Sequence, residues 1–212
     1  IRSGAPRIAF KLDIFKAFDS LSWDYLFTVL ELQGFHPRFI EWFRVCITGS
    51  MLSIKVNGAL EGYFKCNAGL KQGDPLSPYL FVLAMEGLTA CISKACESTD
   101  FIFHSKTREA KITNLIFADD VLLFCHGDNT SVQVLLDAVH QFSAMSGLHL
   151  NPDKCFSFFG NVPSATQDFT IALSHFNSGA LPVVYLGLPL VSGKLFIREC
   201  QPLVTKICNR FE

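Results

Sequence analysis

Two adjacent aspartates interrupt an otherwise apolar stretch in the second half of the chain. The runs Leu115 to Ala118 and Val121 to Cys125 are apolar, and only Asp119 and Asp120 separate them. Two short apolar runs around such a break predict a tight β-hairpin with both acids at its tip. Burying an unpaired carboxylate costs far more than a hydrogen bond returns. The tip must therefore either project into water or hold a divalent cation, and hard ions such as Mg²⁺ prefer carboxylate oxygen.

A third acid, Asp13, lies in a similar setting near the start of the chain. It interrupts the apolar run Ile8 to Ile14, which predicts a strand, and a turn into a helix follows. If this strand pairs beside the hairpin in one sheet, the three carboxylates converge on one point. Two divalent ions about 3.5–4 Å apart could then bind there and stabilise both the attacking and the leaving oxygen of a phosphoryl transfer. Taken alone, an Asp-Asp pair at a hairpin tip is more often a solvated turn.

Apolar periodicity, caps and turn residues outline the remaining elements. Ser22 is a candidate N-cap for a helix that Gly34 ends, and Asn57-Gly58 predicts a hairpin turn. The expected helices cover 22–34, 37–48, 77–95, 130–146 and a last segment from about 199 that still runs at 212; the expected strands cover 8–14, 51–56, 63–66, 115–118, 121–125, 157–159 and 185–190. A shaped loop is expected at 68–78, and a loose polar loop before residue 185. This order predicts an α/β (α+β) fold.

Composition limits the class of protein but not its partners. Half of the 212 residues are apolar, so the chain can bury a sizeable core. The net charge of −1 is unlike that of a free-standing nucleic-acid binder, which clusters Lys and Arg against phosphate. The eight cysteines include no C-x-x-C pair, which disfavours a zinc knuckle. The first residues lack a signal pattern, and Pro and Gly break the uncharged stretch 169–193, so we expect an intracellular protein without a transmembrane segment.

Five short motifs follow one another along the chain. They are K-L-D-I-F-K-A-F-D-S at 11–20, G-L-K-Q-G-D-P-L-S-P at 69–78, F-A-D-D at 117–120, S-G-L-H-L-N-P-D-K at 146–154 and Y-L-G at 185–187. In order and spacing they resemble motifs A to E of the reverse transcriptases of LINE-type (non-LTR) retrotransposons, particularly those of plants. Phe117-Ala118 before the Asp pair resembles the non-LTR branch, because retroviral and LTR-type enzymes usually have Tyr at the first position. The resemblance covers nearly the whole chain and implies a polymerase palm, an antiparallel sheet backed by helices.

The resemblance implies a metal site and a nucleotide gate. Asp13 and Asp119 would be the two metal-binding carboxylates with Asp120 beside them, and the main-chain carbonyl of Ile14 would be a further ligand. Two Mg²⁺ (or Mn²⁺) ions are the implied cofactors. Phe18 matches the bulky residue that excludes a ribose 2′-hydroxyl, and the alternative for Phe18 is a core aromatic.

Further motif positions imply contacts with substrate. Gln72 and Gly73 lie where the family places the incoming nucleotide and the template. Lys154 matches a candidate general acid that protonates the pyrophosphate leaving group, and the alternative is a solvated Lys after a turn. The primer grip would be formed by Tyr185, Leu186 and Gly187, for which plain strand packing is the alternative.

The resemblance implies an RNA-directed DNA polymerase that acts in the nucleus on an RNA template, a DNA primer and dNTPs. Residues 1–190 would form the palm with partial fingers, and residues 191–212 the start of a thumb or connection helix. Because most of the family's fingers and thumb and its endonuclease are missing, we do not expect these residues alone to polymerise. One alternative is a catalytically inactive relic or a domesticated RNA-binding domain with the same fold. Another palm enzyme, such as a nucleotide cyclase, is disfavoured because motif B and Y-L-G would have no purpose there. The oligomeric state is not predicted.

Overall fold

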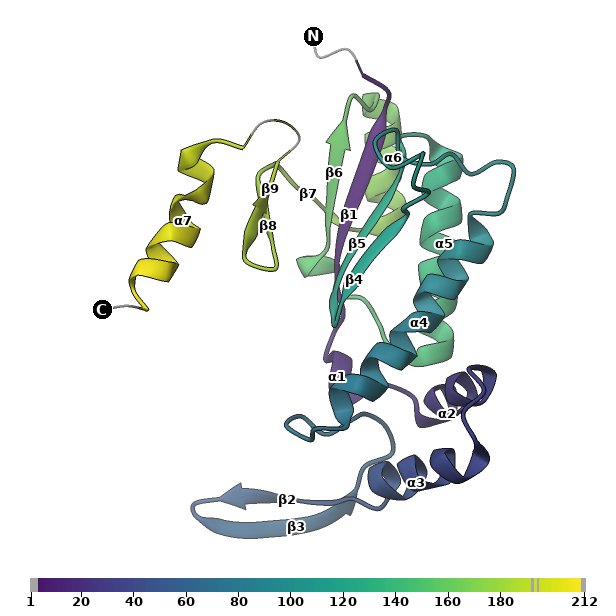
Figure 1. Cartoon of the computed structure of the whole chain (residues 1–212), viewed down its shortest axis with the longest axis vertical. Coiled ribbons are helices and arrows are strands. Elements are labelled where there is room, and N and C mark those ends of the chain that lie inside the picture. The colour runs from purple at the N-terminus through teal and green to yellow at the C-terminus, as the bar shows by residue number, and fades with distance from the viewer. Residues whose placement is uncertain (1–3, 192, 194, 211–212) are drawn as a thin grey trace.

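The central element of the fold is a five-stranded sheet (Figure 1). The computed structural model describes residues 4–191, 193 and 195–210. In spatial order the strands are β4 (Asn114–Phe117), β5 (Asp120–His126), β1 (Arg7–Asp13), β6 (Phe156–Gly160) and β7 (Asn177–Ser178). β1 pairs antiparallel with both β5 and β6. The predicted antiparallel sheet is confirmed with one correction, because the short strand β7 runs parallel to β6 and makes the sheet mixed.

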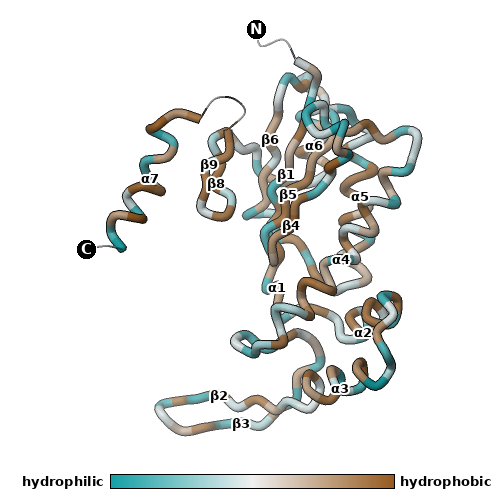
Figure 2. The backbone as a smooth tube through the Cα atoms, in the orientation of Figure 1, coloured by the Kyte–Doolittle hydropathy of each residue, from teal (hydrophilic) through white to brown (hydrophobic). Residues whose placement is uncertain are grey.

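The two faces of the sheet differ because side chains alternate along β1. Ile8, Phe10 and Leu12 are buried in the core, whereas Lys11 and Asp13 on the other face are only partly buried. We call the face of Lys11 and Asp13 the open face. The core face is covered by α4 (Ser77–Ala95) and α5 (Asn129–Ser146), with α6 (Ser164–Ser174) beside α5 (Figure 1). Apolar residues concentrate along the strands and the adjoining helices (Figure 2).

Short-range signals set the helix ends closely. The N-cap Ser22 accepts a hydrogen bond from the Tyr25 amide at the start of α2 (Trp23–Leu32), and α3 (Pro37–Thr48) begins with Pro37 as predicted. The bounds of α4 agree with the prediction at both ends. α5 begins at Asn129 behind the cap Asp128 and ends before Gly147, whose φ is 74°. The single-turn helix α1 (Ala17–Ser20) was not predicted.

A long hairpin projects beyond α3 at the lower end of the molecule (Figure 1). Its strands are β2 (Met51–Val56) and β3 (Ala59–Lys65), and the second begins earlier than the predicted 63–66. Asn57 and Gly58 form the predicted turn, with φ of 49° and 91°. Nearly every residue of both strands is exposed.

Two predictions for the segment after β6 are wrong. The expected loose loop contains α6, whose buried positions include Thr170 and Ser174 in place of apolar residues. Their hydroxyls donate to carbonyls one turn earlier, at 2.7 and 2.8 Å, which satisfies these polar groups inside the core. Because polar residues occupy buried positions, the sequence of this helix lacks a clear apolar period. The expected strand 185–190 is instead the hairpin of β8 (Val183–Tyr185) and β9 (Leu188–Leu190), with Leu186 and Gly187 in its turn.

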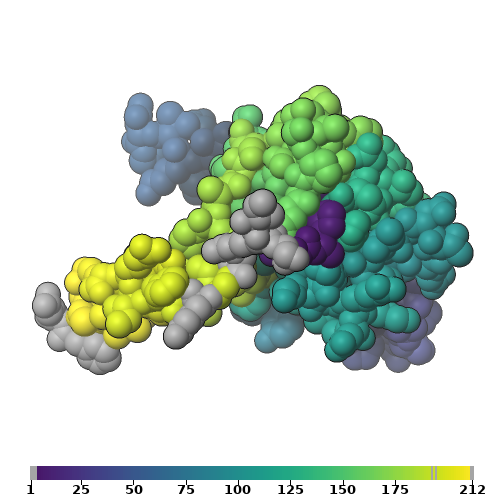
Figure 3. All heavy atoms as spheres, turned by 90° about the horizontal axis from the view of Figure 1, so that it is seen from above, coloured from purple at the N-terminus to yellow at the C-terminus, as the bar shows by residue number. Residues whose placement is uncertain are grey.

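The last helix, α7 (Ile197–Cys208), stands away from the body of the molecule (Figure 3). It begins two residues before the predicted residue 199 and ends at Cys208. The prediction that the helix continues to residue 212 is therefore wrong for residues 209 and 210, and Glu212 lies outside the described residues. In the part of the chain that the structure describes, no helix is long and apolar enough to cross a membrane.

Candidate active site

Asp13 and Asp120 occupy directly opposite positions on neighbouring strands. The register of β1 and β5 pairs Asp13 with Asp120, so both side chains leave the sheet on the open face. Opposite residues of an antiparallel pair have Cβ atoms about 4.5–5.5 Å apart, and like charges at that separation destabilise the sheet. The pairing that the sequence left conditional is therefore present, and it places two carboxylates where a cation would be favourable.

Asp119 lies in the two-residue turn that joins β4 to β5. Phe117 pairs with Asp120 across the end of this hairpin, which leaves Ala118 and Asp119 as the turn. Ala118 has a φ of 52°, a left-handed conformation that costs a residue with a Cβ about 1–2 kcal/mol. Asp119 is exposed, whereas Asp120 is half-buried, so the two neighbouring acids have different surroundings.

Lys154 forms an ion pair with Asp13. The Lys154 Nζ lies 3.9 Å from Asp13 Oδ2, with 68% of the Lys154 side chain and 38% of the Asp13 side chain exposed. An ion pair this long and this exposed contributes about 0–1 kcal/mol. Among the residues that the structure describes, no group of three His, Cys, Asp or Glu side chains is arranged to hold a metal ion. The assignment of Asp13, Asp119 and Asp120 as metal ligands therefore stays a prediction.

The backbone of Asp13 is held by the segment that follows α5. The Asn151 amide donates to the Asp13 carbonyl at 2.9 Å, and Ile14 forms an isolated bridge with Leu150. The Asp13 amide donates to the Sγ of Cys155 at 3.3 Å, and this thiol is within 3.8 Å of the Asp13 carbonyl. Burial raises the pKa of the Cys155 thiol to about 11, which keeps it protonated at neutral pH. The sequence analysis assigned no role to Cys155, although its position next to Lys154 was a usable signal.

The loop 68–76, here the Gln72 loop, packs on the segment after β1. The Gly69 amide donates to the Leu21 carbonyl at 2.8 Å, and the Leu70 amide donates to the Phe18 carbonyl at 2.6 Å. The Phe18 ring stacks on Phe81 of α4 with ring centroids 4.8 Å apart. Phe18 is thus partly buried against the core, as its alternative reading requires, and its role as a gate stays a prediction.

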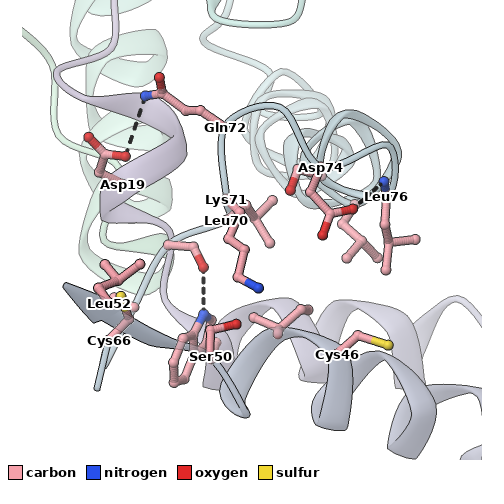
Figure 4. Close-up of a pocket in the computed structure, with 16 residues that line it drawn as sticks. Asp19, Cys46, Ser50, Leu52, Cys66, Leu70, Lys71, Gln72, Asp74 and Leu76 are labelled. Carbon is pink, nitrogen blue, oxygen red and sulfur yellow. Dashed lines mark hydrogen bonds between the residues drawn. The ribbon is translucent and has the colours of Figure 1, made fainter. Parts of the chain in front are cut away.

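A cavity of about 580 Å³ opens between this loop, α3 and β2 (Figure 4). Gln72 lies at its edge, and the Gln72 Nε2 donates to Asp19 Oδ1 at 3.4 Å. Leu70, Leu76 and Leu80 contribute apolar lining, whereas Asp19, Lys71 and Asp74 contribute charge. Gly73 and Phe18 are not among the lining residues, nor are the three candidate metal ligands.

The β8–β9 hairpin approaches the open face near Asp120. The Lys11 Nζ donates to the Val184 carbonyl at 3.2 Å, which connects the hairpin to β1. Partial burial and then the charge of Asp120 raise the pKa of Tyr185, so the Tyr185 hydroxyl lies within electrostatic reach of that carboxylate. Leu186 and Gly187 form an exposed turn, with φ of 50° and 80°. The predicted primer-grip residues therefore lie at the end of β8 and in the turn that follows it, with Tyr185 near Asp120, and their role stays a prediction.

The family model of the reverse transcriptases, described as reverse transcriptase (RNA-dependent DNA polymerase), matches residues 2–190. The chain belongs to the reverse transcriptase family. It is 36% identical over 146 residues to the Pol polyprotein of the type-2 retrotransposable element R2DM of Drosophila melanogaster, which covers 69% of this chain and 13% of that protein. It is 31% identical over 189 residues to the Pol polyprotein of a type-1 retrotransposable element R2 of Popillia japonica, covering 85% of this chain and 30% of that protein. This reverse transcriptase domain is therefore related to polymerases of non-LTR type, and it spans less than a third of the length of these relatives.

Solved structures show the same fold. A telomerase from Candida tropicalis, solved in complex with a fragment of telomeric RNA, superposes with a TM-score of 0.61 over 100% of this chain and 35% of that chain. The sequence identity is 12%, so this likeness concerns the fold alone. The predicted α/β reverse transcriptase fold is thereby confirmed.

Proposed function

We propose that this reverse transcriptase domain is the palm of an RNA-directed DNA polymerase from a non-LTR retrotransposon of LINE type, similar to those of plants. It would extend a DNA primer with dNTPs on an RNA template, in the nucleus. Residues 1–190 would form the palm with partial fingers, and residues 191–212 the start of a thumb. The observation that carries the proposal is the register that places Asp13 opposite Asp120, beside the turn that holds Asp119.

The acidic end of the sheet fits divalent cations in its donor chemistry. Three carboxylates from β1 and the β4–β5 hairpin offer only hard oxygen ligands, and the opposed pair gains from a counter-charge. Asp13, Asp119 and Asp120, with the Ile14 carbonyl, would hold two Mg²⁺ or Mn²⁺ ions. Bound ions would stabilise the charge on the attacking and leaving oxygens.

The chain's own groups would orient the substrates and move a proton. Gln72 and Gly73 would contact the incoming nucleotide, and Phe18 would exclude the ribose 2′-hydroxyl. The Lys154 ammonium, whose Nζ already lies on the acidic side of the sheet, would donate a proton to the pyrophosphate oxygen. Tyr185, Leu186 and Gly187 would hold the primer strand beside Asp120.

Ion binding by the chain itself tests the acidic site. Mn²⁺ titration followed by electron paramagnetic resonance should detect binding that Asp13→Asn and Asp119→Ala each weaken by at least about tenfold, because each change removes a charged ligand. Asp168→Ala, which removes an exposed carboxylate from α6, is the matched control and should bind as the unmodified chain does. Equal binding by all four proteins would remove the metal assignment.

Primer extension tests the activity. The protein encoded by the longest open reading frame that contains this chain should extend a DNA primer on an RNA template, and Asp119→Ala should abolish DNA synthesis. RNA binding without ion binding or synthesis would instead favour an inactive or domesticated RNA-binding domain.

A further inference from the structure

Trp23 connects the start of α2 to the Gln72 loop. Its indole Nε1 donates to the Gly69 carbonyl at 2.7 Å, across 46 positions in the sequence. This bond lies beside the two backbone hydrogen bonds that Leu21 and Phe18 accept from the loop. Three hydrogen bonds therefore attach residues 69 and 70 to the segment 18–23, and Trp23 supplies the only side chain among them.

The attachment brings two backbones into direct contact. A Cβ on Gly69 would lie 2.6 Å from the Asp19 carbonyl oxygen, and Gly69 has a φ of 84°. Only glycine fits this approach without a shift of backbone. The Gly69 carbonyl is turned toward Trp23 and would lose its side-chain partner if the indole N–H were absent.

The rest of the loop has weaker support. Gln72 reaches Asp19 through one exposed hydrogen bond of 3.4 Å, near the upper limit for such a bond. Asp74 Oδ1 accepts from the Leu76 amide at 2.9 Å, which shapes the loop locally without attaching it to α2 (Figure 4). The place of Gln72 relative to Asp19 therefore depends on the attachment at Gly69, which Trp23 completes.

We infer that Trp23 is a positioning residue for the nucleotide site. Its indole N–H fixes the Gln72 loop at Gly69, and this sets the position of Gln72 and the width of the 580 Å³ cavity that Trp23 also lines. The role in nucleotide binding rests on the proposed function, whereas the attachment of the loop does not.

The chain provides a matched control for this role. It contains two tryptophans, and the second, Trp42, lies on α3 with 56% of its surface exposed and its ring against Phe39. Trp23→Phe removes the N–H donor and keeps an aromatic ring. Trp42→Phe makes the same chemical change outside the cavity lining.

Amide hydrogen exchange on the full chain tests the attachment. In Trp23→Phe the Gly69 and Leu70 amides should exchange about tenfold faster, the upper range for loss of one hydrogen bond, while the β1 amides keep their protection. Trp42→Phe should leave all of these rates unchanged. Unchanged exchange at Gly69 and Leu70 in Trp23→Phe would overturn the inference, and retained β1 protection shows that the variant is folded.

Nucleotide kinetics test the consequence for the site. In primer extension by the protein that the longest open reading frame encodes, Trp23→Phe should raise KM for dNTP about tenfold. The kcat and the affinity for an RNA–DNA duplex should stay nearly unchanged. An unchanged KM, or parallel losses in kcat and duplex affinity, would show a merely structural residue and overturn the role. If the unmodified protein makes no DNA, the nucleotide role fails together with the proposed function, whereas the exchange rates still decide the attachment.

Discussion

Helix α4 has a glycine in its interior for which the structure gives a packing reason. The Tyr25 hydroxyl of α2 donates to the Ala84 carbonyl at 2.8 Å, directly over Gly87. A Cβ on Gly87 would fall well inside contact distance of that hydroxyl oxygen. Tyr25 cannot easily move away, because its ring also packs edge-on against Phe142, with centroids 5.9 Å apart. We therefore predict that Gly87→Ala destabilises the protein although alanine is the better helix former.

The expected magnitude combines opposing terms. Replacing glycine by alanine inside a helix stabilises by about 1 kcal/mol. Overpacking costs about 1–3 kcal/mol, and displacement of the Tyr25 hydroxyl costs about 1 kcal/mol for the hydrogen bond to Ala84. The net loss in the free energy of unfolding should be about 2 kcal/mol, which for a chain of 212 residues lowers Tm by about 4–8 °C.

A double-mutant cycle isolates the cause. In Tyr25→Phe the nearest remaining ring atom, Cζ, lies 3.1 Å from the added Cβ, so a small shift of the ring is sufficient. Urea unfolding should show that Gly87→Ala is close to neutral in that background, with a coupling energy of about 2 kcal/mol. Additive effects, with a coupling below about 0.5 kcal/mol, would refute the steric explanation.

Three further predictions concern stability. Gly69→Ala and Gly73→Ala both place a Cβ at positive φ, but only the Cβ at residue 69 would meet backbone atoms. Urea unfolding should therefore show that the free energy of unfolding falls by about 3 kcal/mol in Gly69→Ala and by about 1 kcal/mol in Gly73→Ala. Equal losses would contradict the close approach at Gly69. Burial raises the pKa of Cys155 from 9.0 to about 11, so the stability that the protonated thiol contributes is complete below pH 9 and is lost as the pH rises to 11. Over that window the free energy of unfolding of the unmodified chain should fall by about 2 kcal/mol more than that of Cys155→Ser. Parallel pH profiles of unfolding free energy for the two proteins would contradict this prediction. Partial burial acts to raise the pKa of Asp128, but hydrogen bonds from Ser131 and His126 outweigh it and lower that pKa, so this contribution is present above about pH 4 and lost on further acidification. Asp128→Ala should lower the free energy of unfolding by about 1 kcal/mol at pH 7, because the N-cap is lost. Asp128→Asn should keep the cap, and its Tm, measured by thermal melts, should fall less steeply as the pH is lowered below about 4.

Local sequence signals predicted much of the scaffold. Pro78 and the apolar face of Leu80, Ala84 and Leu88 defined α4 at both ends. The Asn57-Gly58 turn was recognisable because both residues tolerate positive φ. Helix α6 was missed because Thr170 and Ser174 fill positions that usually carry apolar side chains. The turn after β8 was missed because Leu186 adopts a left-handed conformation that leucine rarely takes.

The candidate site was predictable in its residue types and not in its contacts. The motifs identified Asp13 and the Asp119-Asp120 pair, but strand order had to be assumed before they could be brought together. The contacts of Cys155 with Asp13 and of Trp23 with Gly69 join residues 142 and 46 positions apart. Such pairs depend on how the sheet and helices dock, which no local pattern encodes.

The candidate site combines residues from a central strand and from an exposed turn. Asp13 ends β1, which is flanked by strands on both sides, whereas Asp119 lies on an exposed two-residue turn at the outer hairpin. Opening fluctuations are rare in a central strand and frequent at such a turn. Asp13 would therefore keep its position when a substrate binds, and the backbone of residues 118 and 119 would be the part that moves. If Asp119 binds a metal ion, relaxing the left-handed backbone of Ala118 would reorient that carboxylate and leave the scaffold unchanged.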